Sequence, residues 1–308
     1  MDPILAILGP TASGKSTLAL DLAVRHHGEI VSCDSTAVYR GFDIGTDKVP
    51  IEQQRGIRHH LIDVADPTEH FTAARYAKEA ATGIRHIQAR GHWPIIVGGT
   101  GFYYRALTKG LFPGPGRNED LRRRLERLAE SKGVEFLHRM VRRVDPASGQ
   151  RIQPRDRMRL IRALEVYFLT GRPLTEHFVA TVSPLEGLDV FAVALNPPME
   201  EIARRVTARV NEQFARGVVQ EVQDLLARGV PETAHPFGGL VYRQVLQCLH
   251  GVRDEAGTRA LIVRENLRYA RRQLIWFRKE PNLLWFQGAG EEPHTRTAVE
   301  QALRLRSS

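Results

Sequence analysis

The chain has 308 residues, of which 42% are hydrophobic and 26% charged. This composition is typical of a folded protein with a buried core and excludes a disordered or low-complexity chain. Its two cysteines, Cys33 and Cys248, exclude a disulfide framework and a cysteine-rich zinc site, and they favour a reducing, cytoplasmic location. No apolar run approaches the ~20 residues that a transmembrane helix needs, so we expect no membrane contact.

Strands and helices alternate over the first hundred residues. Apolar runs predict strands at 4–8, 30–33 and 94–97, and helical spacing predicts helices over 16–26 and 72–90. Strands that alternate with helices form a parallel sheet that is covered on both faces. The first part of the chain is therefore predicted to be α/β.

A Pro-Gly-Pro-Gly run at 113–116 ends this alternation. Residues 118–171 are then helical throughout, a strand is expected at 190–195, amphipathic helices extend from 199 to 279, and a last strand is expected at 283–286. No apolar heptad repeat is present, so we expect a monomer.

The net charge of +9 is concentrated in two segments. Residues 117–172 contain 15 Lys/Arg and 8 Asp/Glu, and residues 258–279 contain 7 and 1. Such patches are typical of proteins that bind nucleic acid, although two solvated helix faces would give the same pattern.

The segment after the first predicted strand matches the phosphate-binding loop pattern G-x-x-x-x-G-K-[ST]. In such a loop, backbone N–H groups and the helix N-terminus face phosphate oxygens, Lys15 adds a positive charge, and the Ser16 hydroxyl can ligate Mg²⁺. The predicted phosphate site consists of Gly9, Pro10, Thr11, Ala12, Ser13, Gly14, Lys15 and Ser16. The pattern leaves open whether the phosphates belong to a nucleotide or to another diphosphate.

We therefore predict a P-loop NTPase-like α/β core with a parallel sheet and helices on both faces. The core comprises residues 1–116 and 184–308, and a basic helical insertion domain occupies residues 117–183.

Two more segments follow predicted strands. Asp34 comes directly after the second strand, and Thr100 lies in the glycine-rich run 98–101 after the third. Because carboxyl ends of parallel strands meet at one edge of the sheet, both residues are expected beside the phosphate loop. Asp34 there fits a general base or a carboxylate linked to Mg²⁺, and it also fits a residue that caps a turn.

Six motifs, taken in order, resemble those of the tRNA dimethylallyltransferases, also called tRNA isopentenyltransferases or IPP transferases. They are residues 9–16, 34–41, 59–63, 97–103, 162–167 and 269–273. The resemblance implies transfer of a dimethylallyl group from dimethylallyl diphosphate to N6 of the adenosine that is 3′ to the anticodon, position 37 of tRNA. It also implies Mg²⁺ dependence and an insertion that grips the anticodon arm.

The resemblance further implies roles for individual residues. Asp34 takes the N6 proton, Thr100 lies beside the reacting groups, and an arginine of the helix at 199–216 stabilises the diphosphate. Arg205 and Arg209 are both candidates for this arginine, and Arg209 is favoured. The implied tRNA contacts are Asp34, Ser35, Thr36, Ala37, Thr100, Arg122, Met158, Arg159, Leu160, Ile161, Arg162, Arg271, Arg272 and Gln273.

The chain departs from the family pattern at three places, one of which is Ile275, where a hydroxyl residue is expected after Arg-Arg-Gln-x. Thr36-Ala37 stands where the family usually has Met-Gln, and Leu240-Val241 precedes Tyr242 where Ile-Gly is usual. The change at Thr36-Ala37 falls on positions that contact tRNA in the family, so it bears on base recognition.

Two other functions stay open. A P-loop kinase of a small molecule would share the phosphate loop and Asp34, but it would consume ATP and would not need the two basic segments. A non-catalytic RNA-binding protein on a decayed P-loop scaffold would tolerate changes of Asp34 and Lys15.

Overall fold

The computed structural model describes residues 3–178 and 181–307, which separate into two compact units. One unit contains the chain up to Thr108 and from Pro184, and the other is Lys109–Ser183. The helical unit thus begins eight residues before the start that the Pro-Gly run suggested at 117.

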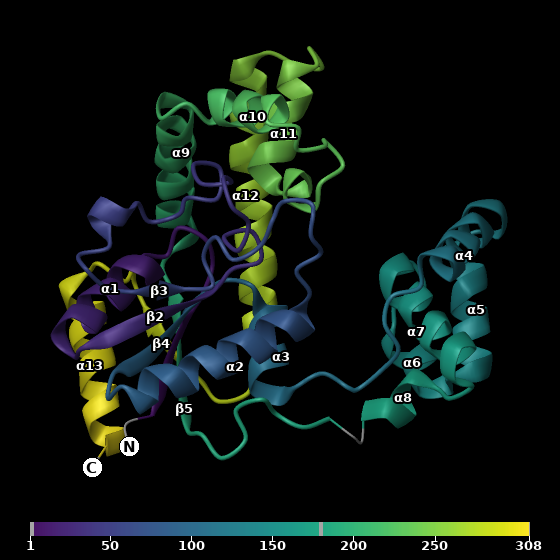
Figure 1. Ribbon diagram of the computed structural model, residues 1–308, viewed down its shortest axis with the longest axis horizontal. Helices are drawn as coiled ribbons and strands as arrows, with labels where there is room; N and C mark the ends of the chain where they lie inside the picture. The colour runs from purple at the N-terminus through teal and green to yellow at the C-terminus, as the bar shows by residue number, and fades with distance from the viewer. Residues whose placement is uncertain (1–2, 179–180, 308) are drawn as a thin grey trace. The chain divides into compact units, whose positions relative to one another are not determined.

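The first unit is built on a six-stranded parallel sheet with the strand order β3-β2-β4-β1-β5-β6 (Figure 1). The strands are β1 Ile4–Leu8, β2 Gly28–Cys33, β3 His59–His60, β4 Trp93–Gly98, β5 Val190–Asn196 and β6 Leu283–Gln287. Leu8 pairs with Gly98 on one side and Ala194 on the other. The carboxyl ends of the central strands are therefore level, and the loops that follow them meet at one edge.

Helices cover both faces of this sheet. On one face, α1 (Lys15–Arg25) contributes Leu18 and Leu22, and α13 (Pro293–Ser307) contributes Val299, to the apolar cluster over the central strands. On the opposite face, α2 (Ala73–Ala89) contacts β2 and β4. This burial on both sides explains why β1 and β4 are continuous apolar runs.

A group of helices lies beyond the carboxyl edge of the sheet (Figure 1). These helices are α9 Met199–Ala215, α10 Val218–Ala227, α11 Leu240–Leu249 and α12 Glu255–Phe277. The long α12 packs against α9 and α11, and α10 packs against α9 and α11. The short helix α3 (Gly101–Lys109) continues from the glycine-rich run after β4.

Every regular element that the structure describes in the second unit is a helix. The unit contains α4 Glu119–Lys132, α5 Val134–Val144, α6 Pro146–Arg151, α7 Arg157–Thr170 and α8 Leu174–His177. Leu137, Val141, Leu160 and Leu164 form the centre of its core and are completely buried.

Inside this core, the carboxylate of Glu165 is fully buried. It accepts two hydrogen bonds from Arg122, at 2.9 Å each, one from Arg162 at 2.7 Å, and one from the Asn118 N–H at 2.8 Å. Burial would raise the pKa of Glu165, but these donors outweigh it and lower the pKa to about 2.

The strands and helices predicted from the sequence are present, with ends that shift by a few residues. The elements that were not expected include the two-residue strand β3, the helices α3 and α8, and the C-terminal helix α13. Within residues 3–178 and 181–307, every helix is either too short or too polar to span a lipid bilayer.

Candidate active site

The phosphate loop connects β1 to α1 and adopts a backbone that depends on its glycines. Gly9 has φ 140° and Gly14 has φ 78°, conformations that L side chains rarely adopt. A Cβ at Gly9 would also lie only 2.8 Å from the Leu195 carbonyl oxygen. The loop residues Gly9 to Ser13 are largely buried, whereas Ser16 is exposed at the start of α1.

Lys15 folds back over this loop. Its Nζ donates to the Pro10 carbonyl at 2.5 Å and to the Ser13 hydroxyl at 3.4 Å. Burial of the ammonium, with Arg209 nearby, lowers the pKa of Lys15 to about 7, and Asp34 opposes this shift. A cation desolvated in this way gains a counter-charge when an anion enters the loop.

Of the two candidate arginines on α9, Arg209 contacts the phosphate loop. Its Nη1 donates to the Thr11 hydroxyl at 3.0 Å, and its Nε pairs with Asp47 at 2.9 Å. Arg205 instead pairs with Glu201 and Glu291. The geometry thus favours Arg209 for direct contact with a ligand in the loop.

Asp34 lies at the end of β2, where the sequence predicted it. Its Oδ1 accepts hydrogen bonds from the Thr36 N–H at 2.8 Å, the Thr36 hydroxyl at 2.7 Å and the Ala37 N–H at 3.2 Å. Its Oδ2 has no hydrogen bond to any residue of the described chain. One oxygen therefore caps a turn, and the other stays available to a ligand, so the two readings of Asp34 are compatible.

Thr100 and Gln273 tie neighbouring loops together. The Thr100 hydroxyl accepts the Ser35 N–H at 3.1 Å. The Gln273 amide accepts the Thr11 N–H at 2.9 Å and donates to the Gly99 carbonyl at 2.9 Å. Gln273 was expected to contact tRNA, but its side chain is 6% exposed and bridges the phosphate loop to the glycine-rich run.

Two cavities adjoin at this edge of the sheet. A cavity of about 520 Å³ extends along the phosphate loop, and one of about 310 Å³ lies between the Asp34 turn and the helices α9, α11 and α12. The residues that line both are Thr11, Asp34, Thr46, Asp47, Arg209 and Tyr269. Asp34 and Arg209 are therefore positioned where a ligand in one cavity would meet a ligand in the other.

The other expected tRNA contacts of this unit differ in exposure. Ser35 and Thr36 line the smaller cavity, whereas Ala37 is 7% exposed. Arg271 and Arg272 are exposed on α12, and Arg272 lies over the Tyr269 ring at 5.7 Å.

The expected contacts in the helical unit are of two kinds. Met158 and Arg159 are exposed on α7. Leu160 and Ile161 are at most 1% exposed, so their side chains are core residues and cannot contact RNA. Arg122 and Arg162 hold Glu165, and the Arg122 side chain is only 12% exposed.

Three residues of the site were not predicted from the sequence. Asp47 pairs with Arg209, Tyr269 lines both cavities, and Glu221 holds the loop that carries Asp47. Asp47 and the loop that carries it lie far from Arg209 and Glu221 in the sequence, and tertiary packing brings them together. Tyr269 belongs to a motif quoted above but was not assigned a role.

The fold and the site define an α/β protein of the P-loop type in which a carboxylate and an arginine adjoin the phosphate loop. The IPP transferase family model matches residues 37–280. The tRNA dimethylallyltransferase of Solibacter usitatus is 45% identical over 304 residues, covering 98% of this chain and 99% of the relative. "tRNA dimethylallyltransferase 1" of Trichlorobacter lovleyi is 46% identical over 286 residues, with 92% of each chain covered.

Solved structures agree with these relatives. The full-length tRNA isopentenylpyrophosphate transferase of Bacillus halodurans has a TM-score of 0.71 and 33% identity, covering 100% of this chain and 98% of that one. A eukaryotic dimethylallyltransferase acting on tRNA shares the fold, with a TM-score of 0.78 at 24% identity. This chain belongs to the IPP transferase family.

Proposed function

We propose that this protein transfers a dimethylallyl group from dimethylallyl diphosphate to N6 of adenosine 37 in tRNA, giving N6-isopentenyladenosine and diphosphate. The observation that carries the proposal is the position of Asp34, with one carboxylate oxygen without a partner in the described chain, beside the phosphate loop and where two cavities adjoin. The relatives named above support the choice of substrates.

The phosphate loop is the proposed site of the diphosphate. Its backbone N–H groups and the N-terminus of α1 provide positive potential, and Lys15 and Arg209 provide two cations. As the allylic C–O bond breaks, negative charge grows on the departing diphosphate. These groups are already in place, so they stabilise that charge without further rearrangement.

The residues at the loop also fit Mg²⁺. The exposed Ser16 hydroxyl is a hard oxygen donor at the mouth of the loop, and the described chain contains no cluster of three His, Cys, Asp or Glu side chains that could hold a metal ion alone. This donor set suits an ion that takes most of its ligands from the diphosphate and water. When bound there, Mg²⁺ would neutralise charge on the leaving group.

Asp34 is the proposed general base. The N6 amine is a weak nucleophile because its lone pair is delocalised into the purine ring. As N6 forms a bond to the allylic carbon, the C–O bond to the diphosphate breaks and one N6 proton passes to Asp34. The hydrogen bonds to Oδ1 keep the carboxylate in place, while Oδ2 can accept the proton.

Binding of tRNA is assigned to the basic surfaces and to the smaller cavity. The target adenine must leave its base stack so that its N6 amine can reach the allyl diphosphate. Ser35 and Thr36 line the smaller cavity, where we expect this base to bind, and Thr100 is bonded to Ser35. In the helical unit, Met158, Arg159 and the exposed arginines Arg124, Arg127, Arg142 and Arg143 are available for backbone contacts. We further assign the protein to the cytoplasm, which is consistent with its two free cysteines, and we expect it to be a monomer.

The test is transfer of label from radiolabelled dimethylallyl diphosphate to unmodified tRNA in the presence of Mg²⁺. We expect label on N6 of adenosine 37, and none when Lys15→Ala replaces the wild type. ATP consumption without allyl transfer would point to a small-molecule kinase. Tight tRNA binding without any transfer, unaffected by Lys15→Ala, would point to an RNA-binding protein.

A further inference from the structure

The loop between β2 and β3 carries Asp47, the carboxylate that holds Arg209. Asp47 adopts a left-handed backbone with φ 59°, which is unfavourable for a residue other than glycine and persists only where the surroundings enforce it. Its carboxylate meets Arg209 Nε at 2.9 Å, which leaves Nη1 directed at Thr11 of the phosphate loop. The orientation of Arg209 therefore depends on this loop.

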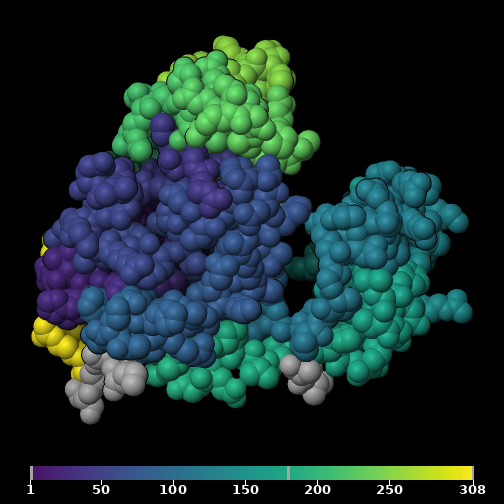
Figure 2. Space-filling model, viewed as in Figure 1, coloured from purple at the N-terminus to yellow at the C-terminus, as the bar shows by residue number. Residues whose placement is uncertain are grey.

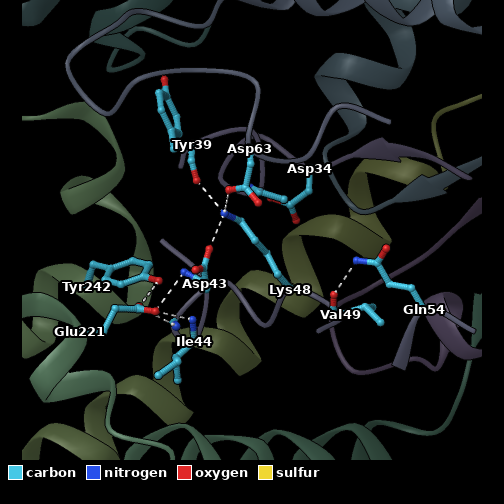
Figure 3. Close-up of polar contacts among 12 residues, drawn as sticks. Asp34, Tyr39, Asp43, Ile44, Lys48, Val49, Gln54, Asp63, Glu221 and Tyr242 are labelled. Atoms are coloured by element: carbon cyan, nitrogen blue, oxygen red, sulfur yellow. Dashed lines mark hydrogen bonds and ion pairs between the residues drawn. The ribbon is translucent and has the colours of Figure 1, made fainter. Parts of the chain in front are cut away.

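Glu221 of α10 anchors the loop on one side (Figure 3). Its carboxylate accepts the backbone N–H groups of Asp43 at 3.1 Å, Ile44 at 2.7 Å and Gly45 at 3.4 Å. It also accepts the hydroxyl of the buried Tyr242 at 2.6 Å. Four donors converge on one side chain, three of them from consecutive residues just before Asp47.

The loop has no room to shift toward α11. A Cβ at Gly45 would lie 2.6 Å from the Tyr242 ring, so the backbone of the loop lies directly against that ring. In the space-filling view, the green surface of α10 and α11 lies against the blue-violet surface of this part of the chain (Figure 2). Glu221 and Tyr242 together form a rigid support for residues 43–45.

Lys48, which follows Asp47 in the chain, anchors the loop at a second place (Figure 3). Its side chain is 6% exposed, and Nζ donates to the Tyr39 carbonyl at 2.6 Å, to Asp43 at 2.7 Å and to Asp63. Asp47 therefore lies between residues 43–45, which Glu221 holds, and Lys48, and its own carboxylate pairs with Arg209.

We propose that Glu221 is a positioning residue that acts on the diphosphate site through Asp47 and Arg209, without touching the substrate. The inference rests on the proposed function, because it takes the ligand of the phosphate loop to be a diphosphate. It adds a residue of α10, which lies outside the phosphate loop and the Asp34 turn, to those that determine diphosphate binding.

The test is a double-mutant cycle with Glu221→Ala and Asp47→Ala, measured as the Kd for inorganic diphosphate with Mg²⁺ by calorimetry. We expect Glu221→Ala alone to weaken diphosphate binding about tenfold and to leave tRNA affinity unchanged. In the Asp47→Ala background the same change should have an effect below about twofold, because the link to Arg209 is already absent. Equal effects in both backgrounds would show a general structural role and overturn the proposal.

Milder variants keep the test decisive if Glu221→Ala does not fold. Tyr242→Phe removes one hydrogen bond to Glu221, and Glu221→Gln retains an acceptor; both should weaken diphosphate binding by about two- to fivefold. Asp224→Asn is the matched control on the same helix, because the Asp224 side chain is bonded only to Gln220 in the described chain, and it should leave binding unchanged. Unchanged binding in Tyr242→Phe and Glu221→Gln would overturn the proposal.

Diphosphate binding without transfer of label by the wild type would instead refute the proposed function. The double-mutant cycle would remain valid in that case, because it measures diphosphate binding alone.

Discussion

Replacing Glu165 by Gln should destabilise the helical unit of residues 109–183. The pKa of this buried carboxyl falls from 4.5 to about 2, which corresponds to roughly 3 kcal/mol of stability at neutral pH. Glu165→Gln leaves Arg122 with a buried charge and no carboxylate, and breaking such a pair typically costs about 3–5 kcal/mol. We therefore expect a loss of about 3 kcal/mol in the free energy of unfolding.

The sign of the pH dependence follows from the lowered pKa. The contribution of Glu165 is fully present above pH 4.5 and is lost as the pH falls toward 2. The difference between wild type and Glu165→Gln should thus shrink from roughly 3 kcal/mol at pH 7 to roughly 1 kcal/mol at pH 3.

Urea unfolding with hydrogen exchange resolved over residues 109–183 measures this difference. Glu135→Gln is the matched control, since its partner Arg155 has an 89% exposed side chain and the pair should contribute little. Equal stability of wild type and Glu165→Gln at pH 7, or a difference that does not change with pH, would refute the reasoning.

Three further predictions concern the first unit. Gln273→Ala removes the bridge between Thr11 and Gly99 and should lower kcat/KM for dimethylallyl diphosphate about tenfold, without changing tRNA affinity; steady-state kinetics and filter binding measure both. Ser16→Ala should raise the Mg²⁺ concentration needed for diphosphate binding, as followed by calorimetry, and an unchanged requirement would exclude Ser16 as a ligand. The Glu29 carboxylate is bonded to His60, Arg90 and His92, and these contacts lower its pKa to about 2 although burial would raise it. Glu29→Gln should therefore lower the melting temperature at pH 7, and by progressively less as the pH falls below 4.5.

The sequence predicts the parts of the site that depend on local patterns. The phosphate loop has a fixed spacing, and Asp34 and Thr100 follow strands whose carboxyl ends must meet in a parallel sheet. These residues lie together in the structure, and the resemblance over the whole chain agrees with the family that the comparisons identify.

Contacts between distant segments could not be predicted in the same way. Glu221 binds a loop that is 176 to 178 residues away in the chain, and Asp47 meets an arginine on a helix from the other end of the sheet. No periodicity or spacing rule reports such pairs, because tertiary packing alone brings them together.

The burial of two side chains that were expected to contact tRNA could have been predicted from the sequence. Leu160 and Leu164 are four residues apart on α7, and with Ile161 they form an apolar stripe typical of a core-facing helix side. A continuous motif on a helix contains both buried and exposed positions, because the two faces alternate along the sequence. The helix α13 was missed because its apolar residues are few, with Val299 the one that is completely buried within the described part of that helix.

The central claim is that Asp34 accepts the N6 proton. It is tested most directly by the single-turnover rate of allyl transfer by Asp34→Asn, compared with wild type at saturating tRNA. Because asparagine keeps an oxygen to cap the turn at Thr36, the fold and the tRNA affinity should stay unchanged while the rate falls about 10²- to 10⁴-fold. Transfer by Asp34→Asn at the wild-type rate would contradict the account.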